Sequence, residues 1–259
     1  MIAVCVSGIS SFIPEYEKVI KLQRKVFPNY DFFFQQWDQY PKPNVPNCLY
    51  TPEPKWNYHV MEDVKVKPNC PIFKKITKKP GYSTDVSGGR YKLHDGGKMY
   101  RRQKLYEQFK HSANQHIAHA HLVASLPEKY KTIIRLRFDT LVSTKVDYSQ
   151  YIKMAEEGWV IGFDGGREKG DNPGPIHTLK EMAINAPRCE WRIWDHMQFH
   201  PRDRLKNVLE MKQKQELNGS EWGWYQIFVH QSGDTKYKNI FGGESITKWT
   251  KQPLQWEKI

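Results

Sequence analysis

The sequence has few cysteines and no long apolar run. Its four cysteines are scattered, with neither paired metal-ligand spacing nor a dense disulfide pattern: Cys5, Cys48, Cys70 and Cys189. This argues against structural zinc and favours a reduced compartment. No apolar stretch approaches the roughly 18 residues of a membrane span, and residues 1–8 lack the basic lead-in of a signal peptide. We therefore expect a cytoplasmic location and read residues 2–6 as a first buried strand.

Acidic residues are scarce relative to basic ones. The chain carries 40 Lys and Arg against 28 Asp and Glu, a formal net charge of +12. This excess predicts a polyanionic partner, namely nucleic acid, an anionic membrane surface or a phosphorylated substrate. Charge that serves solubility alone is the alternative. Because 39% of the residues are hydrophobic and 14% aromatic, we expect one globular domain over residues 1–259, without repeats or low-complexity tracts.

Regular periodicity is missing from the Pro-rich residues 41–97, where little helix can survive. No acidic residue occurs between Val64 and Thr84, whereas lysines accumulate and aromatic residues lie among them. Such a basic, aromatic insertion suits a nucleic-acid groove, in which Lys neutralises phosphate and rings stack on bases. A solvated surface loop explains the same lysines equally well. The candidate acceptor-binding residues are Lys74, Lys75, Lys78, Lys79 and Trp56.

Outside that insertion, short apolar runs alternate with amphipathic segments, the pattern of an α/β fold. The predicted strands are residues 2–6, 31–34, 132–136 and 159–163, with a strand or loop leading to 199 and an edge strand after 237. The predicted helices are residues 14–27, 98–126, 148–157, 201–215 and 221–230.

The long helix predicted at residues 98–126 carries four histidines. They are His111, His116, His119 and His121. Because spacings of three and five residues scatter them around a helix, we expect most of them to be solvated, with a metal site as the alternative. His230 is a further candidate metal ligand, for which packing within an aromatic helix is the alternative.

The most informative segment is the strand that ends in Arg135, Arg137 and Asp139. In an open α/β sheet such strands end at the ligand-binding edge. An Asp there can hold a divalent cation, and an Arg can clamp a diphosphate through two parallel hydrogen bonds. A purely structural Asp–Arg pair is the alternative.

Several segments together resemble a group of small glycosyltransferases with a GT-A-type nucleotide-sugar fold, found in bacteriophages and polysaccharide gene clusters. The similar features are an opening IAVCVSG strand, an IRxRxD motif, a DHxxF segment and a Glu that begins an aromatic helix. They occur here at residues 2–8, 134–139, 195–199 and 221–225. The resemblance covers most of the chain except about residues 41–97.

The resemblance implies a GT-A-like, Rossmann-type fold and gives roles to matching residues. Ser7 and Gly8 would contact the donor nucleotide, Arg135 or Arg137 its diphosphate, and Asp139 the diphosphate and a Mg²⁺ or Mn²⁺ ion. The catalytic base or acceptor-orienting group would be Asp195 or Glu221. A turn or helix cap at Asp195 and a first-turn acid at Glu221 are the structural alternatives.

This chain departs from the family at two places. Residues 9–11 are Ile-Ser-Ser where many relatives have Gln and Arg, so one phosphate contact of the family is missing. A single Asp replaces the Asp-x-Asp pair of many metal-dependent members, which leaves metal dependence open.

The sequence thus predicts transfer of a sugar, from a donor such as a UDP-sugar, to a hydroxyl acceptor. The charge favours DNA with a hydroxymethylated base, as in phage DNA modification. Synthesis of a surface or lipid-linked polysaccharide is the alternative, and a nucleic-acid-binding protein without catalysis is a third.

Overall fold

A computed structural model describes the parts of the chain that build the sheet and its two faces. These are residues 1–13, 15–55, 82–84, 90–92, 114–164, 193–213, 223–224, 227–228, 236–241 and 246–248. Within these ranges no helix is both long enough and apolar enough to cross a membrane.

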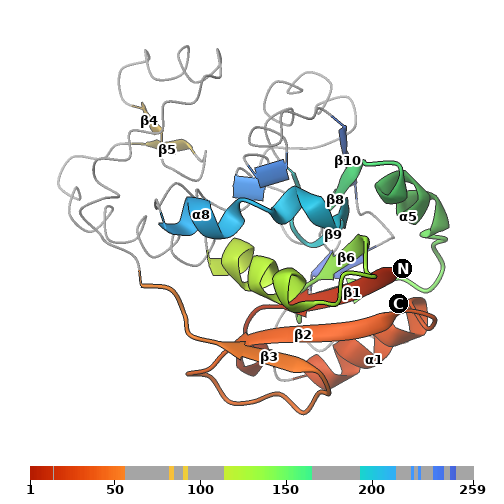
Figure 1. Cartoon of the computed structure of the whole chain (residues 1–259), viewed down its shortest axis with the longest axis horizontal. Coiled ribbons are helices and arrows are strands. Elements are labelled where there is room, and N and C mark those ends of the chain that lie inside the picture. The colour runs from red at the N-terminus through yellow and green to blue at the C-terminus, as the bar shows by residue number, and fades with distance from the viewer. Residues whose placement is uncertain are drawn as a thin grey trace.

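A seven-stranded sheet forms the centre of the described structure (Figure 1). In spatial order its strands are β10 (Tyr237–Phe241), β8 (Val160–Asp164), β9 (Met197–Pro201), β6 (Thr132–Leu136), β1 (Ile2–Ser7), β2 (Asp31–Trp37) and β3 (Cys48–Thr51). Two-stranded antiparallel sheets join β11 (Ile246–Lys248) to β7 (Thr140–Val142) and β4 (Tyr82–Thr84) to β5 (Arg90–Lys92).

The large sheet is mixed, because β9 runs antiparallel to both of its neighbours, β6 and β8. The other pairings are parallel. Strand β1 is central: Ala3 lies beside Asp31 of β2 and beside Ile133 of β6. From β1 the chain moves outward to β2 and β3, and it later returns to the other side of β1 as β6. The order in which the chain adds strands therefore reverses between β1 and β6, and doubly wound sheets bind ligands at such a switch point.

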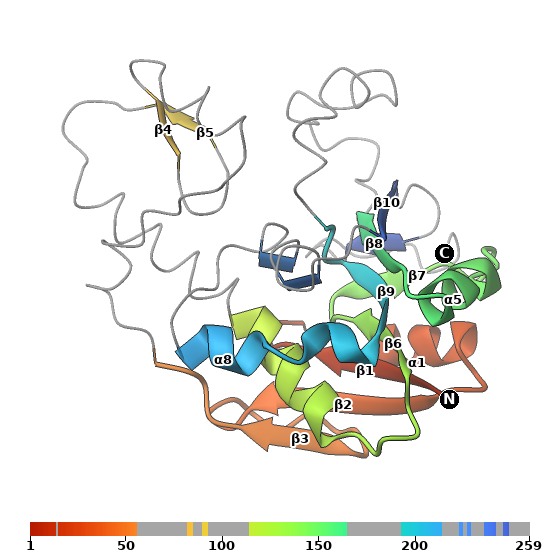
Figure 2. The same cartoon turned by 45° about the horizontal axis from the view of Figure 1, so that its top comes forward.

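Helices cover both faces of the sheet (Figures 1 and 2). On one face lie α1 (Tyr16–Val26) and α5 (Ser149–Glu156); on the other lie the helical residues 114–125 and α8 (Val208–Gln213), preceded by the short 3-10 helix η2 (Arg202–Leu205). A second short 3-10 helix, η1 (Ser10–Phe12), follows β1. The predicted α/β class is confirmed.

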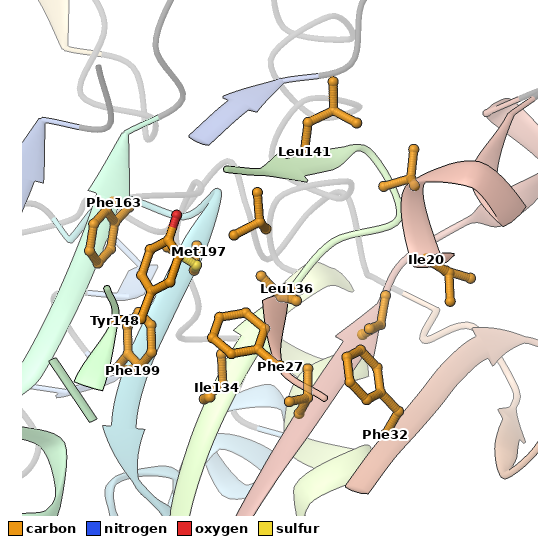
Figure 3. Packing of buried hydrophobic residues seen from close by; sticks show 14 of the residues in the cluster. Ile20, Phe27, Phe32, Ile134, Leu136, Leu141, Tyr148, Phe163, Met197 and Phe199 are labelled. Carbon is orange, nitrogen blue, oxygen red and sulfur yellow. The ribbon is translucent and has the colours of Figure 1, made fainter. Parts of the chain in front are cut away.

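Alternate residues of β6 supply the two cores, as the two-residue repeat of a strand requires. Ile134 and Leu136 face α1 and α5, where they join a cluster that includes Phe27 and Phe199 (Figure 3). Ile133 faces residues 114–125 and joins the second cluster. Because β6 is buried on both faces, its apolar residues are distributed over both of them, and its two polar residues, Thr132 and Arg135, are buried as well.

The strand predicted at residues 132–136 is found with the same bounds. The predicted 201–215 helix is broken: η2 follows directly on β9, and α8 starts only at Val208. A third strand, β3, lies within the Pro-rich 41–97 segment and was not predicted. The predicted 98–126 helix is confirmed over residues 114–125; its earlier part, with His111, lies outside the described residues.

The expectation that most histidines of this helix are solvated is wrong for His116 and His119, which have no exposed surface. His121 is half-buried. Residues 114–125 pack against the sheet and also against Trp224, which lies with Phe228 beside the helix and contacts the sheet through Arg135 of β6. A helix enclosed in this way buries more than the single stripe that its periodicity predicts.

Candidate functional site

A pocket lies where the parallel strands β1, β2, β3 and β6 end. Its walls come from the segments that follow these strands and from the first described turns of the 114–125 helix. The lining residues are Ser7, Gly8, Ile9, Ile13, Trp37, Glu53, Asn114, Gln115, Ala118, Arg137, Phe138 and Asp139. The pocket thus lies at the carboxyl ends of β1 and β6, the switch point of the sheet.

The loop after β1 brings a polar hydroxyl to this pocket. Ser7 is 3% exposed, and its Oγ is a buried atom with no hydrogen-bond partner in the structure. A buried hydroxyl without a partner is unfavourable by about 1–3 kcal/mol. Gly8 follows with φ +138°, a backbone conformation that residues other than Gly rarely adopt. Ser7 and Gly8 therefore line this pocket, and their predicted contact with a donor nucleotide stays a prediction.

The turn after β6 is fixed from both sides. Gln23 of α1 is fully buried, and its Nε2 donates to the carbonyl oxygens of Arg137 at 2.9 Å and Thr140 at 2.8 Å. The Thr140 hydroxyl donates to the carbonyl of His196 at 2.8 Å. The Phe138 ring stacks on Phe34 with centroids 6.2 Å apart. Arg137 and Asp139 therefore stand on a backbone that neighbouring elements hold in place.

Arg137 joins two carboxylates. Its Nε and Nη2 donate to the two oxygens of Asp139 at 2.8 and 2.7 Å, and its Nη1 lies 3.4 Å from Oδ2 of Asp195. Burial favours the neutral guanidine, but Asp139 and Asp195 outweigh it and raise the pKa of Arg137 above its usual value. The predicted phosphate clamp is thus charged and bonded to both neighbouring carboxylates.

Asp195 comes to this edge because β9 is antiparallel. Because β9 runs opposite to β6, the residues that precede β9 lie at the same edge of the sheet as the residues that follow β6. Asp195 is 5% exposed, and although burial would raise its pKa, Arg137, His196 and Arg135 together hold that pKa below its usual value. A carboxylate that holds its proton so weakly is a poor general base. Its position suits orientation of Arg137 instead.

Arg135 does not lie where the expected contact with the donor diphosphate would place it. Its side chain has no exposed surface and does not line the pocket. On the strand it follows Ile134 and so faces the helical residues 114–125, with its guanidinium 4.6 Å from the ring centre of Trp224. The two-residue repeat of β6 explains this placement, since only the residues beyond the end of β6 line the pocket.

Four polar or aromatic residues of the pocket were not predicted: Trp37, Glu53, Asn114 and Gln115. Asn114 Nδ2 donates to Oε1 of Glu53 at 2.6 Å, which joins the helix to the segment after β3. Trp37 ends β2, and Glu53 follows two residues after the end of β3. The end of the predicted strand β2 is a sequence signal for Trp37, whereas Glu53 follows β3, a strand that the sequence does not predict.

Seven predicted site residues lie outside the described residues. They are Glu221, His230, Trp56, Lys74, Lys75, Lys78 and Lys79. Their predicted roles in catalysis, metal binding and acceptor binding stay predictions.

The described residues do not fit a preformed site for a divalent cation. Among them, no three His, Cys, Asp or Glu side chains are grouped so as to hold a metal ion. Both oxygens of Asp139 accept hydrogen bonds from Arg137. Asp139 as a metal ligand stays a prediction, and no chemical step below depends on a metal ion.

No protein-family model matches the sequence, and neither does any curated protein. Solved structures with a similar chain path include the galactosyltransferase LgtC in complex with donor and acceptor sugar analogues (9% identity, 93% of this chain and 74% of that one, TM-score 0.43). Another is 4-diphosphocytidyl-2C-methyl-D-erythritol synthase from Anaerococcus prevotii (11%, 97% and 91%, TM-score 0.47). A third is a glycosyltransferase involved in glycosylation of the major capsid of PBCV-1 (9%, 93% and 82%, TM-score 0.38).

Proposed function

We propose that this chain is a glycosyltransferase that moves a sugar from a nucleotide-sugar donor, a UDP-sugar, to a hydroxyl acceptor. One observation carries the proposal: the pocket at the switch point of the sheet contains both an unpaired hydroxyl and an oriented guanidinium, those of Ser7 and Arg137. The hydroxyl and the loop backbone at Gly8 suit the nucleoside. The guanidinium suits the diphosphate that leaves.

Arg137 supplies the charge that this reaction requires. A departing nucleoside diphosphate develops negative charge, and a preorganised cation in a pocket that excludes water stabilises it. The bonds to Asp139 and Asp195 use three of the five N–H groups of the guanidinium and leave one on each terminal nitrogen for phosphate oxygens. The two carboxylates therefore orient the guanidinium before the donor arrives.

An acceptor hydroxyl needs a proton acceptor within hydrogen-bond reach. Two carboxylates line the pocket. Asp139 is paired with the charged guanidinium of Arg137, whereas Glu53 accepts a hydrogen bond from the neutral amide of Asn114. We assign the role of base to Glu53 or, as the sequence predicts, to Glu221.

For the acceptor we propose DNA that carries a hydroxymethylated base. The net charge of +12 and the Lys and aromatic residues of 41–97 support it. A base in a duplex has to be flipped out to reach a pocket, and aromatic residues can stack on it. A surface or lipid-linked glycan as the acceptor is a separate outcome of the test below.

The test combines donor binding with product analysis. UDP, GDP, CDP and ADP are titrated by calorimetry, and each corresponding nucleotide sugar is then incubated with hydroxymethylated duplex, unmodified duplex or a glycan acceptor. The DNA is digested to nucleosides for mass spectrometry. We expect UDP to bind and a sugar-bearing nucleoside to form. Failure of every nucleoside diphosphate to bind would refute the donor assignment; donor turnover onto the glycan alone would refute the DNA acceptor.

Salt dependence gives a second measure of the acceptor. Binding through lysines to the phosphate backbone releases counterions, so affinity for duplex DNA is expected to fall steeply between about 50 and 200 mM salt. An affinity for DNA that does not change with salt would show that the lysines of 65–79 do not bind the phosphate backbone and favour a solvated surface loop instead.

A further inference from the structure

The guanidinium of Arg135 connects four segments behind the pocket. From β6, its Nη1 donates to the backbone carbonyl of Asp195, and its Nη2 lies 3.4 Å from Oε1 of Gln115 on the helix. Its planar face lies over Trp224. Gln115 lines the pocket, and the side chain of Asp195 contacts Arg137. Arg135 thus contacts the supports of two pocket walls without reaching the pocket itself.

Burial of this cation is costly for folding. Arg135 is among the largest fully buried side chains, and its Nε has no hydrogen-bond partner in the structure. A charge moved from water into a protein interior loses hydration worth several kcal/mol, which backbone and amide acceptors repay only in part. An apolar side chain of similar length would fill the same place without that cost.

Two histidines pack against the Trp224 ring over which this guanidinium lies. His116 lies 4.5 Å from the Trp224 ring between centroids, and His119 lies 5.7 Å from it. His119 in turn contacts His200. Burial, the largest cause, lowers the pKa of Arg135 to about 9, while Asp195 opposes that change. The position therefore does not gain stability from its charge.

We propose that Arg135 is a positioning residue, whose forked guanidinium fixes the spacing between Gln115 and the Asp195 backbone and so keeps Arg137 aligned in the pocket. The inference rests on the proposed function for its UDP-binding readout, whereas its hydrogen-exchange readout is independent of that function. Lys cannot replace Arg here, because an ammonium is a point charge on a flexible chain and lacks the rigid fork.

The test compares Arg135→Met and Arg135→Lys with a matched control, Arg202→Met. Arg202 also bridges two acceptors with one guanidinium, the carbonyls of Pro127 at 2.6 Å and Leu126 at 2.7 Å, but it lies outside the pocket. Three measurements are made on each variant: the melting temperature, amide hydrogen exchange in peptides that cover 114–118 and 193–197, and the Kd for UDP.

For Arg135→Met we expect a melting temperature close to or above that of the wild type, since a buried charge is removed. Exchange in both peptides should rise, and the Kd for UDP should increase about tenfold, the loss expected when hydrogen bonds of a charged group are removed. Arg135→Lys should restore neither the wild-type hydrogen exchange nor the wild-type Kd for UDP. Arg202→Met should lower the melting temperature and leave both peptides and the Kd unchanged.

Unchanged exchange in the two peptides of Arg135→Met would overturn the proposal, and so would equal changes in Arg202→Met. If neither Arg135 variant folds, Arg135 is a structural residue and the proposal fails. If the wild type binds no nucleoside diphosphate, the proposed function fails, while the exchange data still decide whether Arg135 positions these walls.

Discussion

His119 and His200 share one hydrogen bond inside the core, with their Nε2 atoms 2.9 Å apart and no exposed surface on either side chain. The second ring nitrogen of His200, Nδ1, lies 2.8 Å from the carbonyl oxygen of Pro201 and must donate to it. In the neutral ring, Nε2 of His200 is then the acceptor, and His119 donates. The geometry therefore requires a neutral His200 with its proton on Nδ1, and it places a proton on Nε2 of His119.

Stability is expected to decrease as the pH falls below about 6.5, the ordinary pKa of His. Burial, with His200 and Arg135, holds the pKa of His119 well below that value, and burial lowers the pKa of His200 to about 3. The unfolded chain therefore binds more protons than the folded one in this window. Each histidine contributes a slope of up to about 1.4 kcal/mol per pH unit. Urea unfolding between pH 8 and about 4.5 measures it.

Two variants separate this pair from the other titrating groups. His119→Gln should reduce the slope by about one proton, while His121→Gln, on the same helix but half-buried, should change it little. Equal slopes for His119→Gln and the wild type would show that His119 is protonated in the folded state.

Ser7→Ala should weaken UDP binding without loss of stability. The Ser7 hydroxyl has no hydrogen-bond partner in the structure, so its removal should change the free energy of unfolding by less than about 1 kcal/mol or raise it. The lost bond to the ligand should raise the Kd for UDP several-fold. Ser125→Ala is the control, since that hydroxyl already donates to Leu122 O at 2.7 Å; it should lower stability and leave the Kd alone. Unchanged UDP affinity in Ser7→Ala would remove Ser7 from the site.

Asp139→Asn should reduce transfer by about a hundredfold or more, because the neutral amide no longer fixes both Nε and Nη2 of Arg137. The fold should persist, since Asp195 still contacts Arg137. Initial rates with saturating donor measure the loss of transfer, and circular dichroism checks that the fold persists. Asp147→Asn serves as the control: this exposed carboxylate only caps Ser149, at 2.9 Å from its N and its Oγ. Full activity of Asp139→Asn would exclude Asp139 from the mechanism.

Gly162→Ala should destabilise the protein by about 1–3 kcal/mol, the usual cost of overpacking. A Cβ at this position of β8 would lie 2.7 Å from both the backbone N and the O of Trp194. The backbone must then shift next to Asp195, so UDP affinity should fall as well. Urea midpoints and calorimetry test the two effects; an unchanged midpoint would mean that the 193–195 segment moves freely.

The sequence was most informative where a strand is buried on both faces. The apolar runs predict the positions of β1 and β6. The polar residues at the ends of these strands, Ser7, Gly8, Arg137 and Asp139, line the pocket. Local pattern could not show that β9 is antiparallel, since strand direction depends on pairing with β6 and β8. That direction alone places Asp195 beside Arg137.

Two further features lay beyond the local pattern. Strand β3 has a half-buried sequence of four residues between prolines, too short to show a period of two. The burial of His116 and His119 depends on Trp224, about a hundred positions later, as do the surroundings of Arg135. Contacts at such separations are set by the tertiary fold.

The long separation between β1 and β6 also affects synthesis on the ribosome. Strand β1 finds β2 soon after it emerges, but its other partner begins only at Thr132, which lies opposite Ile2. Until then one edge of an apolar strand has no partner, and such edges promote association between nascent chains. The segment before β9 arrives later still. A nascent chain that stalls before residue 195 would therefore display the Arg137–Asp139 turn without the carboxylate of Asp195 that contacts Arg137.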